Sequence, residues 1–320
     1  MMTKSALVMI AAVLAMSARG DRVLADGAPT YDLGKRETWK VGDIVTETIG
    51  ENEVQGYTFP VPGSPTPKAQ TRSSKTSVGM LRKCLEVDAE GGLQKALVFI
   101  RTWSFDNGHG ADTSLEGAFV ETKGRGNART WRVVFAPSPP SEAAKVWLEG
   151  AFGAKRPESE SVRRMWLPKA PVAVGDTWIA DLAPFLEARF ADTPIDRAAT
   201  TSRVRLASVE GQTAKIACEA KIPLLGVPMK KGSEPMPWKK GGVLALTGEV
   251  TVKVEARLGG GAATRYVLEG DAEKDGKSFG VVIQSERHQE TQVGGVMPDL
   301  PKSVVPEAPT PPPAMDPVPR

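Results

Sequence analysis

Apolar and polar residues alternate with a period of two over most of the chain, which is the pattern of half-buried β-strands. In the first half the alternating runs are 44–49, 78–87, 93–103, 115–122 and 129–135. In the second half they are 178–182, 200–209, 213–222, 243–258, 263–272 and 278–290. Short turn-like segments separate these runs, so successive strands are expected to form hairpins. The pattern predicts a mainly β (α+β) fold of antiparallel curved sheets or half-barrels.

One segment between these two halves has a helical period instead. Ala144, Trp147, Leu148 and Ala151 fall at i, i+3, i+4 and i+7. Ser138-Pro-Pro-Ser141 supplies N-terminal cap residues, and Gly153 is a suitable stop. We therefore predict one amphipathic helix between the halves, with its apolar stripe packed on a sheet.

A short Val-Gly-Asp box occurs twice, each time ahead of a strand-like run. The clearer copy is Pro171-Val-Ala-Val-Gly-Asp-Thr-Trp178, and the weaker one is Trp39-Lys-Val-Gly-Asp-Ile-Val45. Glycine permits a backbone bend that a Cβ would resist, and aspartate accepts hydrogen bonds from nearby amides. Each box predicts a strand-entry turn, with a structural role for Asp43 and Asp176. The same order of elements follows both boxes, which indicates a duplication, although β-hairpins can also resemble one another by chance.

Two long segments between strands are rich in Pro, Gly and Ser and are expected to be loops. They cover Pro60–Thr76 and Pro223–Gly242. The segment Ala183–Phe190 is expected to be one short helix or an irregular crossing. Trp103 borders the predicted loop Ser104–Thr113, and Trp238 lies in the corresponding loop Pro223–Gly242, where the two could line an apolar cleft or cap the edge of the core.

Both ends of the chain differ from the β-rich part. Lys4 followed by an apolar run from Ala6 to Ala18 predicts a cleaved secretory signal peptide, with an uncleaved anchor as the alternative. Cleavage is expected before Asp26, or near 18–20. The last residues are rich in proline and are expected to form a disordered tail, either a spacer or a recognition peptide. The expected segments are a signal peptide at 1–25, a β-rich half at 26–137, a helix and connection at 138–165, a second β-rich half at 166–292 and the tail at 293–320.

Net charge gives no argument for a nucleic-acid partner. The chain carries a formal charge of +3, of which the first 25 residues contribute +2, so the remainder is close to neutral. Its charges are interspersed and form no basic patch in the sequence. The apolar run Ala6–Ala18 is too short for a membrane span, and no later segment reaches the length of a span. We therefore expect no nucleic-acid partner and no membrane span in the mature chain.

Residues that carry chemistry are sparse. His109 lies in a predicted loop and His288 in a charged strand, and no Gly-x-Ser-x-Gly elbow occurs. Cys84 lies on a mostly polar strand face and Cys218 on an apolar one, so a disulfide between them stays open. Two distant histidines and two cysteines in unlike settings do not predict a metal site. No catalytic residue, cofactor or binding residue is identified.

The box Pro171–Trp178, preceded by Trp166-Leu-Pro168 and an export signal, resembles an uncharacterised class of secreted bacterial proteins. These proteins carry a Pro-Val-x-Val-Gly-Asp-x-Trp box between two β-rich halves, and the resemblance covers about 35–292. The class implies no activity. The architecture is also similar to that of envelope proteins in which a long curved antiparallel sheet cradles acyl chains.

The expected function is that of an exported, non-catalytic cell-envelope protein, periplasmic or extracellular, with a binding or structural role. Its sheet would hold an apolar ligand on a concave surface, and the candidate partners are a lipid, a glycan or another envelope protein. The alternative is a hydrolase of envelope polymers that uses carboxylates. A catalytic cleft would gather polar groups, whereas a binding cleft of this kind would be largely apolar.

Overall fold

The structure is a computed structural model of the 320-residue chain. It describes residues 29–35, 37–59, 67–125, 128–154, 164–183, 185–186, 193–227, 236–254, 258–274 and 276–301. The chain divides into residues 1–30 and 31–320, and the fold below is that of the second part. The predicted signal peptide and most of the predicted tail lie outside the described residues.

Long antiparallel strands dominate the fold. After β1 (Thr30–Tyr31), the first half contains β2 (Ile44–Phe59), β3 (Lys68–Val87), β4 (Leu93–Asp106), β5 (Ala111–Asp112), β6 (Phe119–Lys123) and β7 (Thr130–Phe135). The helix α2 (Glu142–Phe152) follows. The second half contains β8 (Val172–Ala173), β9 (Thr177–Trp178), β10 (Thr201–Glu210), β11 (Thr213–Pro223), β12 (Gly226–Val227), β13 (Met236–Lys253), β14 (Gly260–Lys274) and β15 (Lys277–Val293). The predicted mainly β fold with one helix is confirmed.

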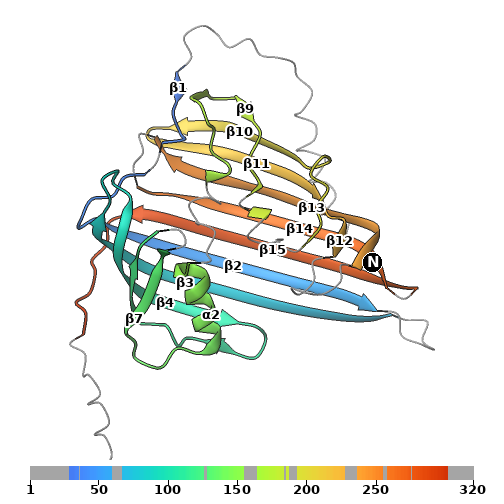
Figure 1. Cartoon of the computed structure of the whole chain (residues 1–320), viewed down its shortest axis with the longest axis horizontal. Coiled ribbons are helices and arrows are strands. Elements are labelled where there is room, and N and C mark those ends of the chain that lie inside the picture. The colour runs from blue at the N-terminus through green and yellow to red at the C-terminus, as the bar shows by residue number, and fades with distance from the viewer. Residues whose placement is uncertain are drawn as a thin grey trace, which may run out of the picture. The chain divides into compact units, whose positions relative to one another are not determined.

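The two halves form one continuous sheet. Its strand order is β7-β6-β4-β3-β2-β15-β14-β13-β11-β10-β9, with β5 and β12 paired beside β4 and β13. Apart from the short β5 and β12, which lie beside this path, strands that are neighbours in this order follow each other in the chain, except where β2 pairs with β15. That ladder runs antiparallel from Val45 opposite Val293 to Thr58 opposite Gly280. Figure 1 shows the blue β2 beside the orange-red β15 in the middle of the sheet.

The first Val-Gly-Asp box is a four-residue turn at the start of β2. The amide of Asp43 donates to the carbonyl oxygen of Lys40 at 3.0 Å, and the amide of Lys40 donates to the Asp43 carboxylate at 2.7 Å. Gly42 has a φ of 94°, which only glycine adopts easily. The amide of Gly42 also donates to Cys84 in β3, whose own amide donates to the carbonyl oxygen of Asp43.

The second box repeats this geometry bond for bond. The amide of Asp176 donates to the carbonyl oxygen of Ala173 at 3.1 Å, and the amide of Ala173 donates to the Asp176 carboxylate at 2.8 Å. Gly175 has a φ of 98°. Leu206 in β10 takes the place of Cys84, because it accepts from Gly175 and donates to Asp176. The structural role predicted for both aspartates is confirmed, and the shared geometry supports the duplication.

The second half departs from the first directly after its box. A strand was predicted from Trp178 to Leu182, but β9 ends at Trp178. Beyond it the amide of Ala180 donates to the Ser202 hydroxyl at 2.9 Å, and the amide of Asp181 donates to the carbonyl oxygen of Met165. These bonds replace the ladder with β10, so the chain leaves the sheet there.

One face of the sheet is covered by the chain itself, and we call it the covered face. Helix α2 packs there through Ala144, Leu148 and Phe152 against apolar side chains of β3 and β4 (Figure 1). Met165, Trp166, Leu182, Phe185 and Leu186 pack on the same face of β10 to β15. The covered face therefore contains two separate apolar clusters, one in each half.

The predicted helix boundaries are confirmed by the caps of α2. The Ser141 hydroxyl accepts from the amide of Ala144 at 3.0 Å, and the amide of Gly153 donates to the carbonyl oxygen of Glu149 at 2.8 Å. The Ser141 hydroxyl also donates to the Asp112 carboxylate. Burial would raise the pKa of Asp112, but hydrogen bonds from Ser141 and from Ser114 outweigh it and lower the pKa. These bonds fasten the start of α2 to the strand segment at β5.

A buried ion pair lies beneath the end of α2. Nε of Arg82 in β3 is 2.9 Å from the carboxylate of Glu47 in β2, and the two side chains are 18% and 9% exposed. The Arg82 guanidinium stands 5.9 Å from the centre of the Phe152 ring. The pair therefore joins the helix, β2 and β3 at one point of the covered face.

Both predicted long loops are shorter than expected. β3 begins at Lys68, so the second part of the predicted loop Pro60–Thr76 is strand, while 60–66 lie outside the described residues. β13 begins at Met236 rather than Val243. Its ladder with β14 absorbs Gly241 and Gly242, both at positive φ, through register shifts. Sequence patterning missed these ends because polar, Pro- and Gly-containing residues there pair only through the backbone.

We predict that Gly175→Ala destabilises the protein by about 1–2 kcal/mol, because an L-residue at this positive φ is strained. The matched control is Gly150→Ala inside α2, where an added Cβ meets no atom within 4 Å. That change should stabilise the protein by about 0.5–1 kcal/mol through helix propensity. Urea unfolding of both variants measures the effects. Equal stabilities would show that the turn does not depend on the glycine conformation.

Candidate functional site

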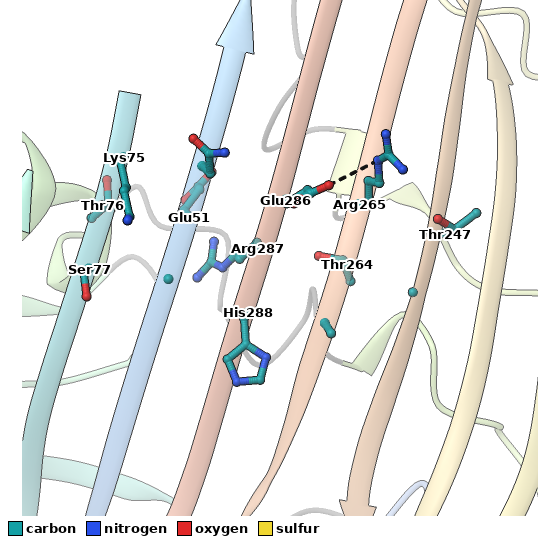
Figure 2. A pocket seen from close by; sticks show the side chains of 14 residues that line it. Glu51, Lys75, Thr76, Ser77, Thr247, Thr264, Arg265, Glu286, Arg287 and His288 are labelled. Atoms are coloured by element: carbon teal, nitrogen blue, oxygen red, sulfur yellow. Dashed lines mark ion pairs between the residues drawn. The ribbon is translucent and has the colours of Figure 1, made fainter. Parts of the chain in front are cut away.

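The face opposite the covered face carries a groove, and we call this side the outer face. The groove has a volume of about 510 Å³ and crosses the middle of β3, β2, β15, β14 and β13. It is lined by Gly50, Glu51, Asn52, Lys75, Thr76, Ser77, Thr247, Gly248, Ala263, Thr264, Arg265, Glu286, Arg287 and His288. Figure 2 shows Lys75, His288 and Arg265 on three of these strands.

Strand register explains how the groove is built. Side chains alternate between the two faces along each strand, and paired residues on neighbouring strands share a face. Val78 in β3 belongs to the cluster that α2 covers, so Lys75 and Ser77 lie on the outer face. From β3 outward, the two outer rows are Lys75, Asn52, Glu286, Arg265 and Thr247, and Ser77, Gly50, His288 and Ala263. Between these two rows lies a third row, whose side chains point to the covered face. The backbone of this third row forms the floor of the groove.

Gly50 leaves open space within the groove. A Cβ built on Gly50 would meet no atom within 4 Å, so the space above this residue is open. Its direct partners are Ser77 on β3 and His288 on β15, and Ala263 lies beyond His288. Because Gly50 and Ala263 are small, there is room between the hydroxyl of Ser77 and the imidazole of His288.

The groove is lined by charged side chains of both signs. Nε of Arg265 lies 3.4 Å from the carboxylate of Glu286, and both side chains are more than half exposed. Lys75 is exposed and makes no ion pair within the part of the chain that the structure describes. Asp106 of β4 lies directly opposite Lys75 on the same face, and Glu249 of β13 continues the second row beyond Ala263, so the outer rows carry no excess positive charge.

Next to the groove the outer face carries valines that alternate with polar side chains. The following two rows contain Val54, Gln284, Val267 and Ala245, and then Gly56, Val282, Glu269 and Val243. Val243 is 42% exposed and Val282 36% exposed. We call Val54, Val243, Val267 and Val282 the valine patch. It adjoins the row of Lys75 and Arg265 on the same strands.

Most residues singled out in the sequence lie away from the groove. His288 lines it, whereas His109 lies in an exposed turn beyond β4. Trp103 is buried against Trp147 of α2, with ring centres 4.9 Å apart, and Trp238 packs at the edge of the second cluster. Both tryptophans thus belong to the core rather than to the groove.

Sequence reasoning missed Gly50, Lys75 and Arg265. A glycine inside an alternating strand often marks a close approach or an open space, and this was the one available signal for Gly50. Lys75 fell in a segment interpreted as loop. The place of Arg265 beside Glu286 depends on strand pairing that the sequence alone does not determine.

The groove does not bring two carboxylates together. Glu286 lies in an outer row and pairs with Arg265, whereas Glu51 belongs to the row that alternates to the covered face. Within the described ranges, no group of three or more His, Cys, Asp and Glu side chains is placed to hold a metal ion. Among the same residues, no helix combines the length and apolar character that spanning a membrane requires.

The two cysteines are free and far apart. Cys84 in β3 and Cys218 in β11 are both buried, and five strand spacings of about 4.8 Å separate their strands. That separation is well beyond the reach of a disulfide. Cys84 is buried although its strand neighbours Arg82 and Glu86 are charged, because the first box turn bonds to its backbone and closes that end of β3.

We predict that neither thiol reacts with iodoacetamide in the folded protein at pH 8, and that both react in urea. Burial, with the Glu249 carboxylate nearby, raises the pKa of Cys218 to about 12, and burial followed by the Asp43 charge raises the pKa of Cys84. The thiolate, which is the reactive form, is therefore scarce. Intact mass before and after unfolding is the measurement. If the native protein had a mass lower by two hydrogens and a reductant restored the full mass, the two cysteines would be bonded rather than free.

No protein-family model and no curated protein matches the chain. Several solved structures align with it at low similarity, including the following two. One describes lipid–protein interactions in lipovitellin, with 9% identity, 82% of this chain covered and a TM-score of 0.30. The chain spans about a quarter (26%) of that protein.

The other structure is an outer membrane channel from Pseudomonas putida F1. It aligns with 10% identity over 82% of this chain and 99% of the channel, with a TM-score of 0.22. At these TM-scores neither alignment carries an argument about function, so the site is interpreted from its own geometry.

Proposed function

We propose that the protein is an exported, non-catalytic binding protein of the cell envelope, and that it holds its ligand in the groove of the outer face. The observation that carries this proposal is the open space above Gly50, in a groove of about 510 Å³ with polar groups on both sides. A volume of this size falls in the usual range of small-molecule sites.

The covered face supports placing the ligand on the outer face. Its apolar side chains in both halves already contact α2 or the segment around Met165 and Phe185. The expected apolar ligand would have to compete with these parts of the chain. On the outer face no such displacement is needed, because the residues above Gly50 leave the space open.

The chemistry of the groove favours binding over hydrolysis. A nucleophile needs a base within hydrogen-bond reach, or a pair of carboxylates must flank the reacting bond. Ser77 and His288 lie on β3 and β15, which are separated by β2 at Gly50. Glu286 is engaged by Arg265. Hydroxyl, amide and cationic groups in fixed positions instead suit recognition of a polar group on the ligand.

The same proposal has three further parts. They are export of the protein, a lipid, glycan or envelope-protein partner, and kinship with the secreted class that carries the Pro-Val-x-Val-Gly-Asp-x-Trp box. The support for export is the predicted signal peptide, and the support for kinship is the box itself. The repeated turn geometry of the two boxes gives that motif a definite structural purpose, which a sequence class would preserve.

We predict that Gly50→Trp abolishes the capture of ligand while leaving the fold intact. The indole fills the open space, and no neighbouring atom has to move to admit the new Cβ. The matched control is Ala217→Trp on β11, an exposed small residue of the same outer row beyond Glu249. Native mass spectrometry of both variants and the parent protein, purified gently from the cell envelope, measures bound material.

Parent protein and Ala217→Trp are expected to carry the same ligand, and Gly50→Trp none. Urea unfolding should place all three within about 0.5 kcal/mol of one another, since these are surface changes. A ligand retained at full occupancy by folded Gly50→Trp would refute the groove as the site. A parent protein that emerges empty and captures nothing from an envelope lipid and glycan extract would refute the binding function itself.

A further inference from the structure

One end of the sheet is closed by the chain itself. There Val204 and Arg205 of β10 pair with β9, and the amide and carbonyl groups of Leu206 both bond to the second box turn. The Ser202 hydroxyl also accepts from the amide of Ala180 at 2.9 Å. The outer edge of β10 is therefore occupied by the segment that precedes it.

The other end of the sheet is open. β7 pairs with β6, and within the described ranges its backbone makes no hydrogen bond to any other segment. The amide and carbonyl groups on the outer side of β7 therefore have no partner among these residues. Figure 1 shows β7 and α2 at one end of the sheet, and β9 and β10 at the opposite end.

The composition of β7 does not protect this edge. Its sequence is Thr130-Trp-Arg-Val-Val-Phe135, with neither lysine nor proline. A second open edge is the part of β3 from Lys68 to Ser74, which pairs only with β2. That part has no large apolar side chain and carries Lys68 and Arg72, a composition that discourages pairing with another chain. The β7 edge instead has the aromatic and β-branched residues of a paired strand.

An exposed apolar side chain of α2 adjoins the β7 edge. The indole N–H of Trp131 in β7 donates to the Glu149 carboxylate at 2.9 Å, so this flank of the helix faces β7. Val146 precedes Glu149 by three residues and shares the flank. Its side chain is 72% exposed. A strand added beside β7 would bring an apolar side chain of the covered face next to Val146.

A second copy of the chain does not fit this edge. Antiparallel pairing centred on Arg132 would place two guanidinium groups directly opposite each other, which is destabilising. Pairing centred on Val133 would place Trp131 opposite Phe135, but the extra residue Val134 turns these two side chains to different faces. Registers centred farther along overlap too little to form a ladder.

The C-terminal segment of the chain does not fit the edge either. Between 302 and 320, prolines leave no uninterrupted run longer than four residues. Proline lacks the amide that a ladder requires, so this sequence cannot match the six residues of β7.

We propose that β7 is a docking edge for an extended segment of another protein, which joins the sheet as a further strand. The segment has apolar side chains on the face of Trp131 and Val146 and polar ones on the face of Arg132. An acidic residue suits the place opposite Arg132, because the present partner Glu121 also lies 3.4 Å from Lys95. The backbone supplies affinity in this mode of binding, and the alternate side chains supply specificity.

The test uses the full-length protein and the end-blocked peptide Thr-Val-Thr-Val-Glu-Val-Thr-Val-Thr as the probe. Hydrogen exchange followed by mass spectrometry measures the protection of amides 130–135, and fluorescence anisotropy of a labelled peptide measures affinity. Saturating peptide should slow exchange at 130–135 and leave exchange at the other open edge, 68–74, unchanged.

N-methylated peptides separate backbone pairing from side-chain contact. Alternate amides of a strand point to the same side, so methylating either the valines or the other residues removes the donors of one side only. One of these two peptides should lose at least about tenfold in affinity, because its donors face β7. The other should bind nearly as well as the unmethylated peptide. Equal binding of both would overturn the proposal.

Protein variants test the contacts on the two faces. Val146→Glu should weaken the peptide about fivefold, because a carboxylate replaces the apolar contact. Ile179→Glu is the matched control, since Ile179 is 80% exposed at the closed end of the sheet. Lysine in place of the peptide's glutamate should weaken binding about threefold through Arg132. Gly50→Trp should bind the peptide as the parent protein does, so failure of the groove proposal is distinguishable from failure of this one.

Each outcome decides the matter. Unchanged exchange at 130–135, or protection confined to 68–74, would refute the docking edge. Protection of 130–135 that rises with protein concentration without peptide, together with a dimer mass, would assign the edge to a second copy instead. Protection of β7 that one methylated peptide loses, and that Val146→Glu weakens while Ile179→Glu does not, would establish the inference.

Discussion

The backbone ladder between β2 and β15 is the constraint on which the rest of the structure depends. It joins a strand near the start of the chain to the last strand and turns two meanders into a single sheet. Without it β2 and β15 would both be edge strands with unpaired amides and carbonyls. The groove spans this ladder, with Gly50 and His288 paired across it. The site therefore exists only where the two halves meet.

The two faces of the sheet differ because α2 and the segment around Trp166 cover one of them. From β7 at one edge, the chain continues through α2 and the segment around Trp166 to β9 at the other edge. These segments cover the apolar residues of one face, and the buried Glu47–Arg82 pair joins sheet and helix beneath Phe152. Replacing such a pair by apolar residues is often harmless, whereas breaking it is costly. The opposite face remains available for polar and apolar groups in adjacent rows.

Local signals in the sequence predicted local structure well. The caps Ser141 and Gly153 marked α2, and the Val-Gly-Asp boxes marked two turns, because each of these features depends on residues within a few positions of one another. Strand alternation revealed the fold class but not the ends of β3 and β13, where polar residues pair through the backbone alone. The groove was beyond reach, because Lys75, Gly50 and His288 are brought together by ladders between distant parts of the chain.

The central position of the ladder between β2 and β15 also governs the order in which the protein can fold. Its partners are separated by more than 200 residues, so their pairing carries a large cost in loop-closure entropy and comes late. During synthesis the first half emerges with the edge of β2 unpaired until the last strand of the chain arrives. Such an edge is a template for pairing with another molecule. Such a protein is exposed to aggregation during synthesis, and this exposure lasts until its own C-terminal strand is complete.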